Sequence, residues 1–528
     1  MPNLRIAIAQ INTTVGDLDG NLARILGAAR QAAAHSPDLV LFPELTIPGY
    51  PPRDILLDEN FTRAVAAATG GLAAEAAGLP PLLVGSLAPA PTRQPDHPNL
   101  YNAAILIQHG RAELVAAKRL LPAYDVFHEP RWFVPGPFMP PITIKGQRLG
   151  VLICEDLWDD GYPIHPPAEL AAAGAQTLLC LAASPYRHGI VQKRLRHAAR
   201  AGLPIIYANL VGATDELIFD GRSFVYSPLP PGEGSGVREN RFSQTLTAFT
   251  DDLALIDLPG LDSAPEQTAL PPASRYEELF SALALGIRDF ARKNGLKRAF
   301  LGLSGGIDSS LVAVLAAQAL GAENVTGIAI PSRYTDPRST TSARELSASL
   351  GIHFETVELD PLHKTAETAL APLLESGTGA ENIQARLRAL ILMAYVNKFG
   401  GFLLNTSNKT ELTIGYSTLY GDLAGTLSPL GDLTKPEVYA LARWVNTRFD
   451  GLIPRFVLER PPSAELRPGQ VDPFDYAAVS PELESLVQSN QSNAAMRQSE
   501  HKRWQAGIIL KVSEKSFGTG RMIPVTRL

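Results

Sequence analysis

The amino-acid sequence predicts an α/β protein with two domains. The chain has 528 residues, which is more than one ordinary hydrophobic core accommodates. Short apolar runs that are typical of buried strands alternate with helical patterns in both halves of the chain. Helical periodicity begins again at residue 275, directly after a stretch that we interpret as a linker, residues 261–274. We therefore expect one domain at residues 1–260 and a second at residues 275–528.

The composition excludes several classes of protein. Hydrophobic residues make up 45% of the chain and charged residues 19%, which is typical of a globular protein. The formal net charge of -6 argues against a surface for nucleic acid. Cys154 and Cys180 are the only cysteines, too few for a disulfide framework, so a reducing compartment is expected. The sequence shows neither a signal peptide nor an apolar run of membrane-spanning length, and we expect a cytoplasmic protein.

The first half of the chain predicts a layered α/β domain. Ala-rich helical patterns, such as residues 22–34 and 64–77, lie between short apolar runs. A Gly- and Pro-rich insertion at residues 227–242 interrupts a predicted hairpin, with strands expected at residues 224–226 and 248–258. The other predicted strands are residues 4–9, 39–42, 82–84, 103–107, 150–154, 177–182 and 205–210.

Three polar residues, Glu44, Lys118 and Cys154, stand at the ends of such strands, where α/β proteins tend to place their sites. A thiol becomes a useful nucleophile when a base removes its proton, and an ammonium stabilises the thiolate and later an oxyanion. The combination predicts acyl transfer from an amide. Taken singly, each residue also has a structural explanation, as a packed thiol, a turn residue or a solvated charge.

The motifs around these residues resemble those of the nitrilase, or carbon-nitrogen hydrolase, superfamily. They are FPEL at residues 42–45 with PGY at 48–50, KRLLP at 118–122 and ICEDLW at 153–158. The resemblance covers about residues 1–260 and implies an αββα sandwich. It implies that Glu44 is the general base, that Cys154 forms a thioester and that Lys118 stabilises the tetrahedral intermediate. Glu129 falls where these enzymes carry a second active-site glutamate.

The resemblance also implies a glutamine site in the first domain. Tyr124 and Ser184 occupy the places of residues that hold the substrate in the glutamine-using members. Glu155 and Lys193 complete the set of glutamine-binding residues that we expect.

One position departs from the pattern of the family at this glutamine site. These enzymes usually carry a basic residue after the glycine that follows the Ser-Pro motif, whereas this chain has Ile190 after Gly189. The missing basic residue would bind the carboxylate of glutamine. The candidates to take its place are Lys193 and Arg187.

The second half of the chain contains the sequence SGGIDSS, residues 304–310, which we call the phosphate turn. It follows the apolar run 299–303 and precedes a helical pattern at 311–320. Two glycines let the backbone approach a ligand closely, and hydroxyls and helix amides offer donors to oxyanions. No lysine closes the turn, so it is not a nucleotide P-loop, and Asp308 requires a cation such as Mg²⁺ to bridge it to phosphate. The alternative is an ordinary tight turn between strand and helix.

The residues after the phosphate turn predict a parallel sheet with helical crossovers. Strands are expected at residues 325–330 and 353–359. Arg333 then stands at a strand end on the same edge as the phosphate turn. Glu411, in a small polar loop, supplies a second carboxylate for the metal.

The motifs of the second half resemble those of NAD synthetases within the ATP pyrophosphatase family. They are PSRYT at residues 331–335, ENIQAR at 381–386, NTSNKTE at 405–411 and LYGDLAG at 419–425. The resemblance implies that Asp308 and Glu411 hold Mg²⁺. The residues implied to bind ATP are Gly302, Leu303, Ser304, Gly305, Gly306, Ile307, Asp308, Ser309, Arg333 and Thr406. The residues implied to bind deamido-NAD are Asn382, Glu411, Asp422, Lys435 and Lys502.

Together the two halves predict a ligase with two coupled reactions. Glutamine is hydrolysed through a Cys154 thioester, and the ammonia displaces AMP from an adenylated nicotinate carboxylate. The expected ligands are deamido-NAD, ATP, glutamine and Mg²⁺, without nucleic acid or membrane, and a homo-oligomer and an internal ammonia tunnel are further expectations. Two alternatives remain open: another ATP-adenylating amidotransferase, and a nucleotide-binding regulator with an inactive amidase domain.

Overall fold

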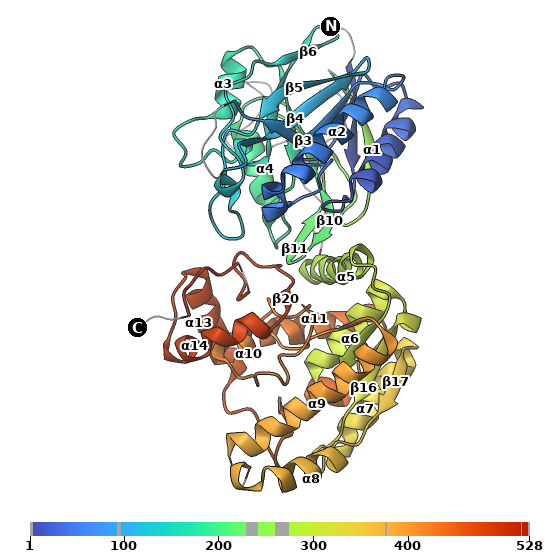
Figure 1. The fold of residues 1–528 in the computed structure, drawn as a ribbon, viewed down its shortest axis with the longest axis vertical. Coiled ribbons are helices and arrows are strands. Elements are labelled where there is room, and N and C mark those ends of the chain that lie inside the picture. Colours follow the sequence, from blue (N-terminus) through green and yellow to red (C-terminus); the bar gives the residue numbers. More distant parts are fainter. Residues whose placement is uncertain are drawn as a thin grey trace. The chain divides into compact units, whose positions relative to one another are not determined.

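The structure is a computed structural model that describes residues 4–91, 97–228, 241–258, 274–374, 377–518 and 520–525. The chain divides into two compact units, each of which is described by itself (Figure 1). The first unit comprises Met1–Thr214 and Ile218–Ala273, and the second comprises Asp215–Leu217 and Ser274–Leu528. The predicted linker lies outside the described residues except for Ser274, and the domain boundaries stay predictions.

The first unit contains two six-stranded sheets. One has the order β14-β1-β2-β3-β4-β5, with β1 parallel to β2 and antiparallel to β14. Its strands are β1 (Leu4–Gln10), β2 (Leu39–Leu41), β3 (Leu82–Pro89), β4 (Leu100–Gln108), β5 (Arg111–Ala117) and β14 (Asp252–Leu258). The other has the order β13-β12-β9-β8-β7-β6. Its strands are β6 (Ile142–Ile144), β7 (Gln147–Ile153), β8 (Thr177–Ala182), β9 (Ile205–Asn209), β12 (Phe224–Ser227) and β13 (Arg241–Thr245).

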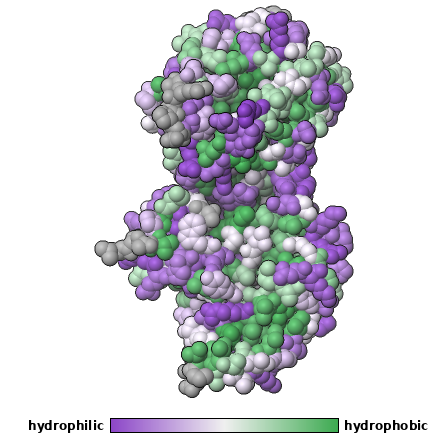
Figure 2. All heavy atoms as spheres, in the orientation of Figure 1, coloured by the Kyte–Doolittle hydropathy of each residue, from purple (hydrophilic) through white to green (hydrophobic). Residues whose placement is uncertain are grey.

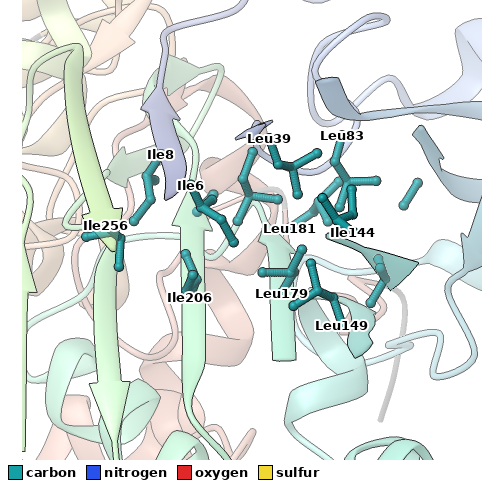
Figure 3. Close-up of a cluster of buried hydrophobic side chains, with 14 of the residues drawn as sticks. Ile6, Ile8, Leu39, Leu83, Ile144, Leu149, Leu179, Leu181, Ile206 and Ile256 are labelled. Atoms are coloured by element: carbon teal, nitrogen blue, oxygen red, sulfur yellow. The ribbon is translucent and has the colours of Figure 1, made fainter. Parts of the chain in front are cut away.

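The core of the first unit lies between these two sheets. Figure 3 shows Ile6 and Leu39 of one sheet close to Leu179 and Ile206 of the other, and all four side chains are fully buried. Burying one such side chain contributes about 1.5–3 kcal/mol, so the shared cluster is the main force that joins the sheets. Helices α1 (Leu18–Ala33) and α2 (Glu59–Glu75) pack on the first sheet, and α3 (Pro166–Ala172) and α4 (Ile190–Arg200) on the second (Figure 1).

This layering confirms the predicted αββα sandwich, but one detail of the strand prediction was wrong. The expected strand at 248–258 begins at Asp252 and pairs with β1 in the other sheet. The hairpin partner of β12 is instead β13, Arg241–Thr245, which begins in the last two residues of the predicted insertion and continues into residues for which no strand was expected. Residues 229–240 of that insertion lie outside the described part of the chain. A short strand with a polar sequence gave no apolar run from which it could be recognised.

The second unit is built on a parallel sheet with the order β17-β16-β15-β18, as predicted. The strands are β15 (Ala299–Gly302), β16 (Val325–Ala329), β17 (His353–Thr356) and β18 (Phe402–Leu403), and a separate parallel pair is formed by β19 (Leu427–Ser428) and β20 (Ile508–Ile509). The helices are α5 (Arg275–Lys293), α6 (Ile307–Leu320), α7 (Pro337–Leu350), α8 (Asp360–Ala369), α9 (Thr378–Phe399), α10 (Lys409–Ile414), α11 (Lys435–Arg448), α12 (Arg455–Glu459), α13 (Tyr476–Gln488) and α14 (Ala494–Ser499).

Helix α6 begins at Ile307, four residues before the helical pattern predicted from the sequence. Gly306 is its N-cap in an extended conformation, and the Ser310 amide donates to the Gly306 carbonyl oxygen at 3.1 Å. The Ser309 and Ser310 hydroxyls donate to the same carbonyl oxygen. Asp308 and Ser309 therefore lie in the first helical turn, where amides without helical partners and the helix dipole favour anions.

Among the described helices, none combines the length and the apolar character that a crossing of the bilayer requires.

Candidate functional sites

Cys154 lies where β7 ends and a single 3-10 turn, Cys154–Leu157, begins. Its backbone adopts a positive φ of 45°, a conformation that non-glycine residues adopt rarely and that is typical of functional sites. Burial raises the pKa of the thiol, the negative charge of Glu44 raises it further, and Lys118 opposes both effects. The thiol is therefore protonated at neutral pH, and its use as a nucleophile requires a base.

Three charged side chains beside this thiol form a buried network. The Lys118 Nζ donates to Glu44 Oε1 at 2.8 Å and to Glu129 Oε1 at 2.7 Å. Lys118 and Glu44 are 1% and 0% exposed. Burial alone would lower the pKa of Lys118, but Glu129 and Glu44 raise it well above its usual value. Burial raises the pKa of Glu129 to about 7, although Lys118 acts against this rise. The structure thus brings the four predicted catalytic residues together.

Two residues without a predicted role, Asn102 and Tyr50 of the PGY motif, support this network. The Asn102 Nδ2 donates to Glu44 Oε1 at 2.7 Å, and the Tyr50 hydroxyl donates to Glu129 Oε1 at 3.3 Å. The Ala183 amide donates to the other oxygen of Glu44 at 3.0 Å. Donors thus fix both carboxylate oxygens of Glu44, so its orientation toward the thiol is set before a substrate binds.

The expected glutamine-binding residues Tyr124 and Glu155 contact one another. The Tyr124 hydroxyl lies 3.1 Å from both carboxylate oxygens of Glu155, and the Tyr162 hydroxyl donates to Glu155 Oε1 at 3.0 Å. Burial raises the pKa of Glu155, and the two tyrosines act against this rise. A carboxylate held in this way next to Cys154 suits the ammonium group of an amino-acid substrate.

Ser184, another expected glutamine ligand, is bound by Arg194, a residue to which the sequence gave no role. The Arg194 Nε donates to Ser184 Oγ at 3.1 Å and its Nη2 donates to the Ser184 carbonyl oxygen at 2.7 Å. Arg194 is fully buried and pairs with Asp220 at 2.9 Å. Lys193 is half-buried on the same helix, and its role at the glutamine site stays a prediction.

The phosphate turn of the second unit borders two cavities. One, of about 170 Å³, is lined by Ser304, Gly306, Ile307, Asp308, Ser309 and Thr406 together with Glu411, Asp422 and Lys435. The other, of about 270 Å³, is lined by Gly302 and Leu303 and by part of the first set, including Ser304 and Thr406. Most of the residues implied to bind ATP therefore surround adjoining spaces.

Gly305 lines neither cavity, but its backbone explains why the turn needs glycine. Its φ is +75°, and a Cβ atom there would lie 2.2 Å from the Ser339 carbonyl oxygen. Any side chain at this position would separate the turn from α7.

Arg333 also does not line either cavity, and it pairs with Asp360 at 3.1 Å and with Glu367 at 3.2 Å. Its contact with ATP stays a prediction. Arg388 of α9 borders the larger cavity instead, and its Nε donates to the Ile330 carbonyl oxygen at 3.1 Å. Burial lowers the pKa of this guanidinium to about 10, so it remains a cation at neutral pH. No sequence pattern distinguishes Arg388 from Arg386, two residues before it on the same helix.

The two carboxylates expected to hold Mg²⁺ share the ammonium of Lys435. Its Nζ lies 2.5 Å from Asp308 Oδ2 and 3.1 Å from Glu411 Oε1. Burial raises the pKa of Glu411 to about 7, although Lys435 opposes this rise. Among the described residues no cluster of three or more Asp, Glu, His or Cys side chains could hold a metal by itself. Two hard carboxylates, one in the phosphate turn and one lining the same cavity, nevertheless fit Mg²⁺, which usually takes its other ligands from phosphates and water.

The residues expected to bind deamido-NAD form a second polar network beside the cavities. Asp422 lines both of them, and its Oδ1 accepts from the Thr418 amide at 2.6 Å. The Thr418 hydroxyl donates to Asn382 Oδ1 at 2.8 Å. The Lys502 Nζ donates to the Gly415 and Ser417 carbonyl oxygens at the end of α10. Neither Asn382 nor Lys502 lines either of these two cavities, and their roles stay predictions.

Comparisons with known proteins match both halves of the chain. Residues 5–230 match the carbon-nitrogen hydrolase family model, and residues 279–516 match the NAD synthase family model. The chain is 39% identical to a glutamine-dependent NAD(+) synthetase of Synechocystis over 99% of this chain and 98% of that protein. It is 38% identical to one of Rhodobacter capsulatus, with the same coverage.

A solved structure agrees with these sequence matches over the whole chain. A glutamine-dependent NAD+ synthetase of Acinetobacter baumannii in complex with ADP superposes with a TM-score of 0.78. That protein is 30% identical, and the match covers 99% of this chain and 98% of that one. The similarity thus includes both units and not one shared domain alone. The chain belongs to the family of glutamine-dependent NAD(+) synthetases.

Proposed function

We propose that this protein forms NAD from deamido-NAD, with glutamine as the nitrogen donor and ATP cleaved to AMP and pyrophosphate. One observation carries the proposal: a single chain holds both a buried Lys118–Glu44 pair beside a nucleophile and a phosphate turn whose Asp308 lines one cavity together with Glu411. The first arrangement releases ammonia from an amide, and the second activates a carboxylate with a nucleotide. Each supplies what the other reaction lacks.

In the first unit, Cys154 attacks the side-chain amide of glutamine. Its thiol is protonated at neutral pH, so Glu44 accepts the proton as the sulfur–carbon bond forms. The ammonium of Lys118, which Glu129 and Glu44 keep charged, stabilises the oxygen of the tetrahedral intermediate. Ammonia leaves, and water then hydrolyses the thioester to glutamate. Glu155, Tyr124 and Ser184 bind the amino-acid end of glutamine.

In the second unit, the nicotinate carboxylate attacks the α-phosphorus of ATP, and pyrophosphate leaves into the phosphate turn. The first turn of α6 offers amides and the Ser309 hydroxyl to these oxygens, and the Ser304 hydroxyl of the preceding turn lies beside them. Lys435 supplies a positive charge beside them. Asp308 and Glu411 would hold Mg²⁺, which neutralises charge on the phosphate oxygens when it is bound.

Ammonia from the first reaction displaces AMP from the adenylate. Ammonia in bulk water at neutral pH is mostly protonated to ammonium, which is not a nucleophile. We therefore propose that ammonia is passed on before it equilibrates with the solvent. The measurement is the ratio of glutamine consumed to NAD formed while an amine scavenger is present, and a ratio that rises steeply with scavenger would contradict direct transfer.

We also propose that the protein is a homo-oligomer with α9 at the contact between copies. Figure 2 shows hydrophobic side chains gathered on the second unit over α8 and α9. The exposed apolar residues there are Leu362, Leu370, Leu373, Leu390, Met393 and Phe399. Exposed apolar patches of this kind usually mark contacts between proteins. We take a second copy of this chain as the partner, because it is present wherever the protein is made. Leu390→Glu should shift the mass measured by light scattering toward the monomer.

The cytoplasmic location stays a prediction.

The test of the proposed function is a product assay on the full chain. We expect NAD to form from deamido-NAD and ATP with either glutamine or ammonium, together with equal amounts of AMP and pyrophosphate. Glutaminase activity without NAD formation would indicate another adenylating amidotransferase. Nucleotide binding without either activity would indicate a regulator with an inactive amidase domain.

A further inference from the structure

We infer that Tyr476, oriented by Asp472, is a positioning residue for Glu411 and Lys435 at the phosphate site of the second unit. The inference rests on the proposed function of that unit. Tyr476 is the first residue of α13, and Asp472 lies in the segment before it. Neither residue belongs to a motif that the sequence marks as functional.

The hydroxyl of Tyr476 lies between two carboxylates. It donates to Asp472 Oδ2 at 2.8 Å and lies 3.4 Å from Glu411 Oε1. The side chain is 8% exposed, so water has little access to compete for this hydroxyl. A phenol has one proton, and at these distances the proton is directed to Asp472 while Glu411 is bound to Lys435.

The ring of the same tyrosine contacts the cation of the site. Lys435 Nζ lies 5.2 Å from the centre of the Tyr476 ring, within the range of a cation–π interaction. One side chain therefore touches both the carboxylate and the ammonium that face Asp308. A shift of Tyr476 would change the position of both charges together.

Asp472 fixes the tyrosine from the other side. Its second oxygen, Oδ1, accepts from the Tyr416 hydroxyl at 3.2 Å, and Tyr416 follows α10, the helix that carries Glu411. The Phe474 ring packs edge-on against both tyrosines, with centroid distances of 5.1 Å to Tyr416 and 4.9 Å to Tyr476. Both Asp472 and Tyr416 line the cavity of about 170 Å³ with Glu411 and Lys435.

This arrangement has a consequence when phosphate binds. Lys435 is divided between Asp308 and Glu411, and an incoming phosphate oxygen competes for the same ammonium. When Lys435 turns toward phosphate, Glu411 Oε1 loses its charged donor. The Tyr476 hydroxyl, 3.4 Å away, replaces that donor and keeps Glu411 in place. Removal of the hydroxyl should therefore weaken the binding of phosphate groups.

The substitution Tyr476→Phe isolates this effect, because it keeps the ring packing and the cation–π contact and removes only the hydroxyl. The control is Tyr395→Phe in α9, where the ring packs against Phe300 and Phe399 away from these cavities. The measurement is calorimetric titration of inorganic pyrophosphate into the full chain with excess Mg²⁺. We expect Kd to rise three- to tenfold for Tyr476→Phe, the usual effect of one lost ordinary hydrogen bond, and to stay unchanged in the control.

A double-mutant cycle separates positioning from a general loss of stability. In a Glu411→Gln background, Tyr476→Phe should have little further effect on pyrophosphate binding, because its target carboxylate is gone. Glutamine hydrolysis should be unchanged in Tyr476→Phe, since Cys154 belongs to the other unit. Pyrophosphate binding equal to wild type, or an additive cycle, overturns the inference. If the wild-type chain binds no pyrophosphate, the proposed function of the second unit fails, and this inference fails with it.

Discussion

The Lys118 ammonium lies 2.8 Å from the Glu44 carboxylate, and both side chains are buried from water. The proposed general base and the proposed oxyanion-stabilising cation are thus held in one buried pair. Its second carboxylate partner, Glu129, lies 2.7 Å from the same ammonium. In the proposed mechanism of the first unit, this buried pair acts on the thiol of Cys154.

Replacement of that nucleophile should separate the two reactions. We expect Cys154→Ala to abolish NAD synthesis from glutamine and to leave synthesis from ammonium close to wild type, because the second unit keeps its own residues. The measurement is NAD formation with each nitrogen source at saturating concentration. Cys180→Ala is the matched control, since it removes a fully buried thiol of β8. Loss of both activities in Cys154→Ala would contradict the division of labour.

Gly305 provides the corresponding test of the second unit. Gly305→Ala should abolish synthesis from either nitrogen source, because the new Cβ would lie 2.2 Å from the Ser339 carbonyl oxygen and displace the phosphate turn. Gly295→Ala is a strict control, because Gly295 also has a positive φ of +66° but open space around its Cβ position. Glutaminase activity should survive both changes. Retained synthesis in Gly305→Ala would show that the turn does not bind phosphate.

Protonation of Asp156 should contribute to the loss of glutamine hydrolysis at acid pH, below the pKa of Glu129, which is about 7. Its carboxylate accepts from the backbone amides of Arg119, Leu120 and Ile153, and so ties the Lys118 segment to the Cys154 turn. Burial raises the pKa of Asp156 to about 6 although these amides lower it. Protonation below pH 6 weakens these bonds, and we expect the rate of hydrolysis to fall there.

As the pH falls, the contribution of Asp156 to the free energy of unfolding should rise while the rate of hydrolysis falls. The reason is that Asp156 in the folded state binds its proton more tightly than in the unfolded chain, where Asp titrates near pH 4. The contribution of Asp156 to the free energy of unfolding is largest below pH 4, falls between pH 4 and about 6, and is constant above. The measurements are the pH profiles of glutamine hydrolysis and of thermal unfolding from pH 4 to 8. A rate that is flat down to pH 5 would disagree with this role.

Arg194 should be important for stability as well as for the glutamine site. Arg194→Met leaves Asp220 buried without its partner, and we expect the free energy of unfolding to fall by about 3–5 kcal/mol. The exposed pair between Arg131 and Asp54 offers a control, and Arg131→Met should leave unfolding close to wild type. Denaturant unfolding followed by fluorescence measures both. A small effect of Arg194→Met would mean that water reaches Asp220.

The sequence predicted elements and motifs well but predicted contacts between distant segments poorly. The phosphate turn and the turn at Cys154 could be predicted because each is a contiguous motif of a few residues that directly follows a strand. The link between Lys435 and Asp308 spans 127 residues, and that between Tyr476 and Glu411 spans 65. Neither has a local pattern. Arg194 was missed because a buried and an exposed arginine on an amphipathic helix look alike in sequence.

The most direct test of the central claim is the origin of the nitrogen in the product. The full chain is supplied with deamido-NAD, Mg²⁺-ATP and glutamine that carries ¹⁵N in its side-chain amide, in the presence of an equal concentration of unlabelled ammonium. Mass spectrometry of the product should show NAD whose carboxamide nitrogen is mainly ¹⁵N. NAD that contains only unlabelled nitrogen, or no NAD at all, would contradict the proposal that the Cys154 site feeds the phosphate-turn site.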